Sequence, residues 1–476
     1  MFASIRRLLG IGPRRMIVRQ IPVVHARYDA AQTTPDNARH WAAADALSAN
    51  TANAPAVRQT LRVRSRYEVA NNSYAKGIVL TLANDTVGTG PRLQVRSDDA
   101  VVNRVIEREW AAWADAVLLA ERLRTMRMAK ATDGEAFAML ARSDTAAGPV
   151  KLSLRLIEAE QVATPTLMPS LGAVDGIELD SGGSPAFYHV LKQHPGDGGV
   201  AAGEYDRVPV AAMLHFFRTD RPGQYRGIPE ITPALPLFAQ LRRYTLAVIA
   251  AAETAADFAA VLYTDAPPDG AADVEPLDQV ELEKRTATTL PAGWKLGQVD
   301  AKQPATTYSE FKAEILNEMA RCLNMPFNVA ACNSSAYNYA SGRLDHQTYY
   351  RSIQVEQAHM ELVVLGPLFR EWLREARLAF AELRGVTADL SIEWMWDGRE
   401  HVDPAKEANA QATRLASHTT TLAAEYARVG KDWEAELRQR ARELVLMREL
   451  GLMAETAAPA KPTPGSTNED GNNEQD

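Results

Sequence analysis

Two short patterns in the sequence contain residue types that support catalysis or nucleotide binding in other proteins. Ser73 and Lys76 match the S-x-x-K pattern of a serine nucleophile with a lysine base, but no S-D-N or K-T-G partner follows them. Gly88 and Gly90 lack the third glycine of a dinucleotide-binding loop, and no G-K-S/T sequence follows them to hold the phosphates of ATP. Neither pattern predicts an active site or a nucleotide cofactor.

Residue types that ligate metals are equally sparse. His189, His194 and His215 fall on a predicted strand, a turn and another strand, without the spacing of metal ligands. Cys322 and Cys332 are the two cysteines, too few for a disulfide framework or a zinc site, and they favour assembly in a reducing cytoplasm. Carboxylates are numerous, but no pair can be assigned as a general acid and base. The sequence therefore predicts no metal, no cofactor and no catalytic residue.

The overall charge limits the function classes. The 476-residue chain has a formal net charge of -8, with 46% hydrophobic and 24% charged residues, which is typical of a globular protein with two to four folding units. An acidic balance argues against a protein whose main task is to grip nucleic acid, because phosphate binding requires a concentrated cationic surface. No membrane span is predicted, since the most apolar window, 235–263, contains charged residues.

The strongest helical pattern lies between residues 308 and 380. Apolar side chains recur every four residues over 308–323 and predict a helix that Pro326 ends. Residues 328–342 contain no charged side chain before position 343 and are rich in Asn, Ser and Gly, which predicts an irregular loop. The helical pattern resumes at Arg343, with a kink expected at Gly366-Pro367. An uncharged loop is therefore expected at the tip of a long kinked helix.

Residues 28–229 alternate helical and strand patterns and predict an α+β unit. Helices are predicted over 71–87 and over 102–128, the second with Trp110 and Trp113 facing inward. Gly88 and the residues after it should end the first helix. Strands are predicted over 92–95, 135–141, 151–157, 186–191 and 213–217.

The remaining segments are mostly helical. Residues 229–261 predict one helix with an alanine-rich second half. The following segment, rich in Pro, Gly and Asp, predicts a small αβ insert with a strand over 294–299. A strand over 390–396 precedes a helix with Asp403 as N-cap and Pro404 as first residue, and then a final helix over 432–450.

The stretch from Asn324 to His346 resembles the helix, tunnel loop and long helix of tailed-bacteriophage portal proteins of the lambda type. Further segments of the same resemblance follow in matching order over residues 27–455: Arg66–Gly77, Asn84–Gly90, Asp133-Gly-Glu135 and Arg221–Pro229. The resemblance implies an α+β portal fold that forms rings, with wing, stem, clip and crown regions. It assigns a basic N-terminal arm (1–27), wing (28–229), first stem helix (230–261), clip (262–307), second stem helix (308–325), tunnel loop (326–342), long kinked helix and wing return strand (343–400), crown (401–455) and disordered tail (456–476).

The resemblance also implies the function and the partners. Such a protein is not an enzyme; twelve copies form a ring at one capsid vertex, through which double-stranded DNA is packaged and ejected without sequence specificity. The expected partners are the terminase large subunit, the major capsid protein, scaffold and the head–tail connector. The protein would be assembled in the host cytoplasm and then reside in the virion. The basic arm is either a flexible extension or a contact to scaffold, capsid or DNA.

Three groups of residues are candidates for these tasks. Ala251 and Ala255 would allow close packing of stem helices. Four acidic residues of the clip would dock the terminase and later the connector, or would be ordinary solvated charges; these four clip acids are Asp269, Asp273, Glu275 and Asp278. The tunnel loop would meet DNA through Asn333, Ser334, Ser335, Tyr337, Asn338, Tyr339 and Arg343.

Two further alternatives stay open. In the first, the tyrosines of the loop do not contact DNA but pack back against the long helix as buttresses. In the second, the chain is not a portal protein but a hydrolase or nuclease with an unidentified site in the β-rich region 135–217.

Overall fold

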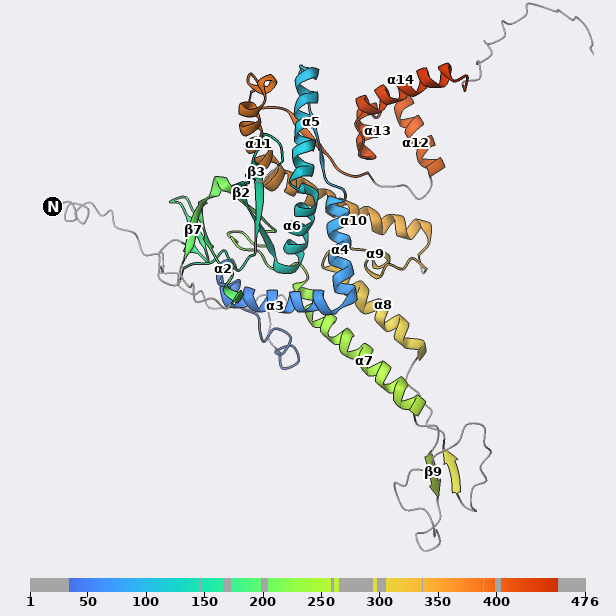
Figure 1. The fold of residues 1–476 in the computed structure, drawn as a ribbon. Helices are drawn as coiled ribbons and strands as arrows, with labels where there is room; N and C mark the ends of the chain where they lie inside the picture. Colours follow the sequence, from blue (N-terminus) through green and yellow to red (C-terminus); the bar gives the residue numbers. More distant parts are fainter. Residues whose placement is uncertain are drawn as a thin grey trace, which may run out of the picture. The chain divides into compact units, whose positions relative to one another are not determined.

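The computed structural model divides the chain into two compact units, residues 1–52 and 53–476. It describes residues 34–144, 147–165, 173–197, 204–257, 261–264, 294–297, 305–335, 337–387, 389–398 and 404–452. In the first unit the described part contains the short helix α2 (Ala49–Ala52), which buries none of its residues. All other elements that the structure describes belong to the second unit (Figure 1). Within the described part of the chain, none of the helices combines the length and the hydrophobicity that a bilayer crossing requires.

Four helices begin the second unit. They are α3 (Pro55–Asn71), α4 (Ser73–Val87), α5 (Ala100–Ala116) and α6 (Leu119–Asp133). The side chain of Asn72 caps α4 by accepting from the backbone N–H groups of Tyr74 and Ala75, and Gly88 ends the helix at a φ of +56°. The predicted helix over 71–87 is thus confirmed from residue 73 onward.

The single helix predicted over 102–128 is wrong. The structure has two helices there, because Leu118 adopts a left-handed conformation with φ 53° between α5 and α6. A leucine gives no sequence signal for this conformation, since the left-handed region favours glycine and asparagine. The inward orientation of Trp110 and Trp113 is confirmed, as both are buried.

Two antiparallel sheets follow the helices. The first has the order β3-β2-β8, with β2 (Glu135–Arg142) between β3 (Leu152–Ile157) and β8 (Met213–Phe217). The second has the order β4-β5-β6-β7, formed by Ala173–Val174, Ile177–Leu179, Pro185–Leu191 and Tyr205–Pro209. The four strands predicted in this region are confirmed as β2, β3, β6 and β8. The sequence did not predict β4, β5 or β7, which have two, three and five residues, and β7 exposes most of its side chains.

The largest core cluster joins the beginning and the end of the second unit. Strand β1 (Arg92–Val95) pairs with β11 (Ile392–Met395), about 300 positions later, in an antiparallel ladder. Trp110 lies at its centre, with ring centroids 4.8 Å from Trp113 and 5.4 Å from both Trp372 and Trp394. Buried aromatic groups of this size supply much of the energy of a core. Both strand predictions, 92–95 and 390–396, are confirmed.

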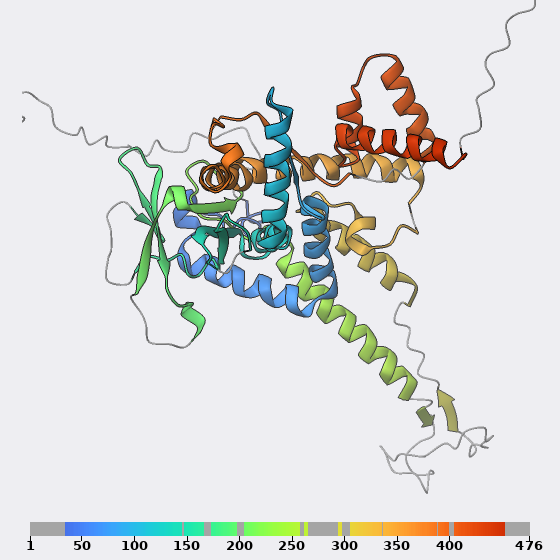
Figure 2. The same ribbon diagram turned by 45° about the horizontal axis from the view of Figure 1, so that its top comes forward.

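Helices α7 (Leu235–Asp257) and α8 (Ala305–Arg321) lie side by side in Figure 1 and Figure 2. The hydroxyl groups of Thr245 and Tyr308 are 3.0 Å apart, and the rings of Tyr244 and Phe311 pack edge to face at 5.1 Å. The prediction that the first helix starts at Pro229 is wrong, because a 3-10 turn, η4 (Thr232–Ala234), precedes α7. Pro233 and Pro236 have no backbone N–H to donate, so an α-helix cannot run through this segment with all of its hydrogen bonds.

Beyond α7 and α8, β9 (Val261–Thr264) pairs with β10 (Trp294–Gly297). The strand predicted over 294–299 is confirmed for its first four residues.

The segment predicted as a loop over 328–342 is partly helical. It contains most of α9 (Phe327–Ala331), a connection over 332–338, and the first turn of α10 (Tyr339–Met360). Pro326 occupies the N-cap of α9, and Cys332 ends that helix in the left-handed conformation with φ 51°. A five-residue helix is too short for periodicity to reveal, so composition alone predicted a loop there.

The long helix continues as expected, but its irregularity lies before Gly366-Pro367. A π-helical turn, η6 (Glu361–Leu365), joins α10 to α11 (Gly366–Ala379), and the backbone N–H of Gly366 donates to the carbonyl of Glu361. Proline at 367 has no N–H for an α-helical bond, which accounts for an irregular ladder at this point.

Three helices complete the described chain: α12 (Pro404–Ala416), α13 (Leu422–Arg428) and α14 (Trp433–Glu449). The final helix is confirmed, and the side chain of Asp432 caps it by accepting from the N–H groups of Glu434 and Ala435. The predicted start at Pro404 is also confirmed. The predicted cap Asp403, the basic arm and the tail from 456 lie outside the described residues.

Candidate functional site

The connection over 332–338 presents the uncharged polar residues that the sequence singled out. Asn333, Ser334, Ser335 and Asn338 are exposed, and Tyr337 is half-buried. Asn333 accepts a hydrogen bond from the backbone N–H of Ser335 at 3.0 Å, so part of its capacity is used within the connection. The structure therefore brings five of the seven predicted contact residues onto one short segment.

The other two predicted residues begin α10. Arg343 is exposed in the first turns of the helix, and Tyr339 is its first residue, with a side chain outside the description. Asn338 is the N-cap of this helix, because its Oδ1 accepts from the backbone N–H of Ser341 at 2.9 Å. The ring of Tyr337 lies close to Gly342, where an added Cβ would stand 3.3 Å from its Cδ1 atom. Asn338 thus has a structural task that composition alone did not reveal.

A side-chain bridge holds the connection against both helices. The amide of Asn328 in α9 lies 3.0 Å from Nε2 of His346 in α10, and it also donates to the hydroxyl of Ser334 at 3.3 Å. The ring of His346 packs edge-on against Tyr350 at 5.5 Å. These contacts restrain the short segment from both ends.

Further along, α10 is fastened to α4. The hydroxyl of Tyr349 donates to the carboxylate of Asp85 at 2.7 Å, and Gln357 donates to the carbonyl of Thr86 at 3.0 Å. Burial, together with the Asp85 carboxylate, raises the pKa of Tyr349, so the phenol keeps its proton for this bond.

A buried ionic group fastens α10 to α6. The ammonium of Lys130 lies 2.6 Å from Glu356, while Arg127 is 2.8 Å from Glu230, ahead of α7, and 3.4 Å from Glu356. Burial would raise the pKa of Glu356, but Arg127 and Lys130 outweigh this and hold it below its usual value. Opposite charges in a low-dielectric interior therefore link α6 both to α10 and to the segment that precedes α7.

A second buried group, which we call the Glu135 cluster, comprises Glu135, Arg62, Arg226 and His215. Arg226 donates to both carboxylate oxygens of Glu135, at 2.7 Å through one terminal nitrogen and 3.0 Å through Nε, and Arg62 also donates to Glu135. Nε2 of His215 is 2.9 Å from the same carboxylate. Burial alone would raise the pKa of Glu135, but Arg226, the bond from His215 and Arg62 hold it well below its usual range.

The backbone near the Glu135 cluster leaves no room for side chains. A Cβ on Gly134 would lie 2.4 Å from the carbonyl carbon of Ile228, and one on Gly227 would lie 2.0 Å from the carbonyl oxygen of Gly134. Arg226 also donates to the carbonyls of Ala159 and Val162 at 3.0 and 2.9 Å. Adjacent glycines and charges in Asp133-Gly-Glu135 and Arg226-Gly227 were the sequence signal for this cluster, but periodicity could not pair them.

The β-rich region also contains a series of side chains that bears on the hydrolase alternative. Glu135, His215 and Tyr188 form a carboxylate, imidazole and phenol series, and a cavity of about 570 Å³ reaches the last two. Both oxygens of the carboxylate already accept hydrogen bonds from arginines. Burial lowers the pKa of His215 and outweighs the opposite effect of its hydrogen bond to Glu135. The carboxylate is therefore committed to stabilising the fold.

Glu158, Glu160 and His194 have possible ligand atoms within 4.8 Å of one another, a grouping that the sequence spacing did not predict. Arg66 lies 2.9 Å from Glu160 and 3.4 Å from Glu158, and His194 lies 3.4 Å from Glu158. The guanidinium of Arg66 therefore lies beside both carboxylates.

The remaining predicted residues are not brought to this loop. Ala251 lies half-buried on α7, and Ala255 is on the same helix with its side chain outside the description. The four clip acids fall between β9 and β10 and lie outside the described residues.

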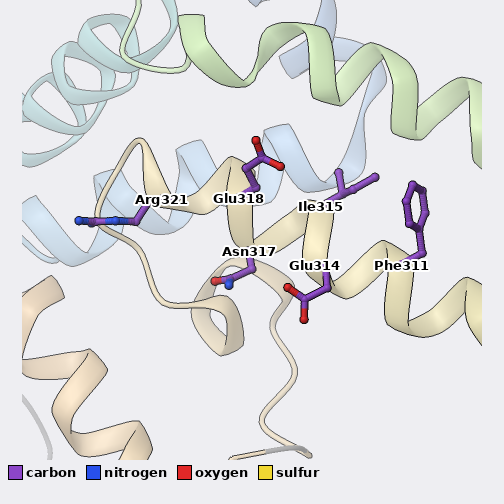
Figure 3. A pocket seen from close by; sticks show the side chains of 6 residues that line it. All are labelled: Phe311, Glu314, Ile315, Asn317, Glu318 and Arg321. Atoms are coloured by element: carbon purple, nitrogen blue, oxygen red, sulfur yellow. The ribbon is translucent and has the colours of Figure 1, made fainter. Parts of the chain in front are cut away.

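An open groove runs along α8, lined by Phe311, Glu314, Ile315, Asn317, Glu318 and Arg321, with a volume of about 460 Å³ (Figure 3). The figure shows Phe311, Ile315 and Glu318 pointing to one side of the helix and Glu314 and Asn317 pointing to the other. The groove thus combines an apolar side with carboxylates.

Comparison with known proteins gives consistent matches. The family model described as phage portal protein, lambda family, matches residues 34–357. A probable portal protein of Halomonas phage phiHAP-1 is 26% identical over 435 residues, covering 83% of this chain and 82% of that protein. Portal protein B of Escherichia phage lambda is 20% identical over 446 residues, covering 81% and 83%.

Among solved structures, a chain from the virion of a native gene transfer agent particle aligns with a TM-score of 0.43 at 15% identity. The alignment covers 78% of this chain and 92% of that one.

Proposed function

Since the chain belongs to the lambda family of phage portal proteins, we propose that its copies form a ring at one capsid vertex, in the virion, through which double-stranded DNA is packaged and ejected. The observation that carries this proposal is the connection over 332–338: its described side chains are uncharged, most of them are polar and exposed, and hydrogen bonds anchor it at both ends. Twelve copies, assembled in the host cytoplasm, are the expected number. The ring has a structural rather than a catalytic task.

The chemistry of the connection suits a surface that DNA passes. Cationic side chains that neutralise phosphates bind DNA strongly, and each such contact would slow translocation. Hydroxyl and amide groups at Asn333, Ser334 and Ser335 exchange hydrogen bonds with water and phosphate at little net cost. Arg343, at the base of the connection, is the one predicted contact that carries a charge.

The other regions supply assembly and docking. Helices α7 and α8 form the stem, with Ala251 and Ala255 in close contacts between helices. The pair β9–β10 is the base of the clip, and the four clip acids dock the terminase and later the head–tail connector. The β-rich unit forms the wing against the major capsid protein and scaffold, and α12 to α14 form the crown.

Negative-stain microscopy of the purified chain tests the ring directly. We expect rings with a central opening wide enough for a DNA duplex. A monomer at every salt and protein concentration would refute the proposal.

A packaging assay tests the connection. The variant Tyr337→Ala, Asn338→Ser, Tyr339→Ala removes both tyrosine side chains. Serine at 338 preserves the helix cap. We expect normal rings with impaired packaging or impaired retention of packaged DNA. The control Asn338→Ala removes only the cap, at a cost of about 1 kcal/mol. Wild-type packaging and retention by the triple variant would remove the connection from the channel.

A further inference from the structure

Helix α10 and the turn after it are apolar on two opposite faces. One face is buried in the chain's own core through Tyr349, Ile353 and Met360. The other carries Leu344, Val355 and Leu362, which are 66%, 65% and 76% exposed. These positions recur at helical spacing, since 344, 348, 351, 355, 358 and 362 share one side of a helix. We call this side the outer face of α10.

The outer face has a positive charge at its middle. Arg351 is exposed on it, between Leu344 and Val355, and it forms no ion pair with a carboxylate of the described residues. A helix that is apolar on both sides is normally covered on both sides. The contacts of α10 with α4 and α6 use the buried face, so the chain's own body does not cover the outer face.

The groove on α8 has the complementary character. Phe311 is 49% exposed beside it, and Glu314 and Glu318 are exposed carboxylates without a described ion-pair partner (Figure 3). The groove therefore offers an apolar seat flanked by negative charge, whereas the outer face of α10 offers an apolar row interrupted by positive charge.

We propose that the outer face of α10 in one copy packs into the α8 groove of the next copy, with Val355 against Phe311 and Arg351 between Glu314 and Glu318. This inference rests on the proposed ring and identifies a surface that closes it. A contact between two unlike faces is heterologous, and its repetition generates a closed ring when the rotation allows.

The spacing along the two helices agrees with this arrangement. Arg351 is four residues from Val355, about 6 Å at about 1.5 Å per residue. From Phe311, Glu314 is about 4.5 Å and Glu318 about 10.5 Å away along the axis of α8. When Val355 lies on Phe311, Arg351 falls between the two carboxylates in one of the two helix directions.

Charge reversal with mixing tests the contact. One variant has Arg351→Glu, and the other has Glu314→Arg with Glu318→Arg. Each alone places like charges together at every interface, and we expect the fraction of protein in rings to fall by about tenfold or more. In an equal mixture, alternating copies restore opposite charges at each interface, so rings should return. Arg108→Glu, the same charge change as Arg351→Glu at an exposed position of α5, is the matched control and should form rings normally.

The possible outcomes separate the inference from the ring itself. Recovery in the mixture supports the contact and shows that both variants are folded. Normal rings from either variant alone overturn the inference while leaving the ring proposal intact. Loss of rings without recovery in the mixture also overturns the inference, provided that both variants keep the wild-type circular dichroism spectrum. If a variant loses this spectrum, Val355→Ser serves as the second test. Normal rings from Val355→Ser would overturn the contact. Failure of the unchanged chain to form rings would refute the proposed function instead.

Discussion

Replacing Glu135 by glutamine is the sharpest test of what holds the β-rich unit together. The carboxylate is fully buried and accepts hydrogen bonds from Arg226, Arg62, His215 and the backbone N–H of Gly227. Glutamine has nearly the same size, so the change creates no cavity. It removes the negative charge and points an NH₂ donor at a site surrounded by other donors.

The magnitude follows from burial. Arg226 and Arg62 have side chains that are 1% and 5% exposed, so both guanidinium groups stay desolvated after the substitution. Asp175, 3.3 Å from Arg226, is the remaining carboxylate near it. Removing one partner of a buried ion pair typically costs about 3 to 5 kcal/mol, because the other charge is left uncompensated. We expect a loss of that size in the free energy of unfolding.

Urea unfolding followed by circular dichroism measures this loss. Glu204→Gln is the control, since it removes an exposed pair with Lys192 at 3.2 Å, for which less than about 1 kcal/mol is expected. If the two variants shift the midpoint equally, the Glu135 cluster is not a buried ionic contact and the reasoning is wrong.

Three further predictions concern pH, assembly and docking. Burial lowers the pKa of His215, whereas the same side chain in the unfolded chain has an ordinary pKa of about 6.5. The unfolded chain therefore binds a proton that the folded chain does not, and stability should fall as pH drops below that value. His215→Gln should reduce the pH dependence of the urea midpoint, and His359, whose pKa is also lowered by burial, should account for part of what remains. Ala251→Leu adds bulk to α7 and should disrupt rings seen by negative stain, at about 1 to 3 kcal/mol per interface; normal rings would mean that this face points to solvent. Lysine at the four clip acids should leave rings intact but weaken terminase binding most at low salt; unchanged affinity at low salt would place docking elsewhere.

Periodicity predicted the elements whose burial is regular. Ile353, Met360, Val364 and Trp372 recur at helical spacing, and the structure buries each of them on one side of the long helix. The strands of the first sheet were predicted differently, from β-rich stretches separated by Gly, Pro and Asp clusters. Strand β7 exposes three of its five residues, so its sequence does not have the apolar character that marks a buried strand.

The errors of the sequence predictions concerned local backbone conformations. Leu118 and Cys332 end or separate helices in left-handed conformations that their residue types do not signal. Asn338 was selected as an exposed polar contact, and it is exposed, but its side chain also caps α10. A single sequence cannot distinguish these tasks, because a capping asparagine and a ligand-facing asparagine have the same composition and the same neighbours.

The Glu135 cluster explains why short matches far apart in the sequence belonged to one family pattern. Asp133-Gly-Glu135 and the segment ending at Pro229 are about 90 residues apart, yet Glu135 accepts from Arg226 and Gly134 packs on Ile228. Arg62, four residues before the segment that begins at Arg66, donates to the same carboxylate, and Arg66 itself is 2.7 Å from Asp133. A buried charge tolerates no unpaired neighbour, so these residues constrain one another through the fold. The resemblance at these positions therefore reflects the architecture of the β-rich unit, whereas the DNA contact that we propose involves the connection over 332–338, where few side chains are fixed by burial.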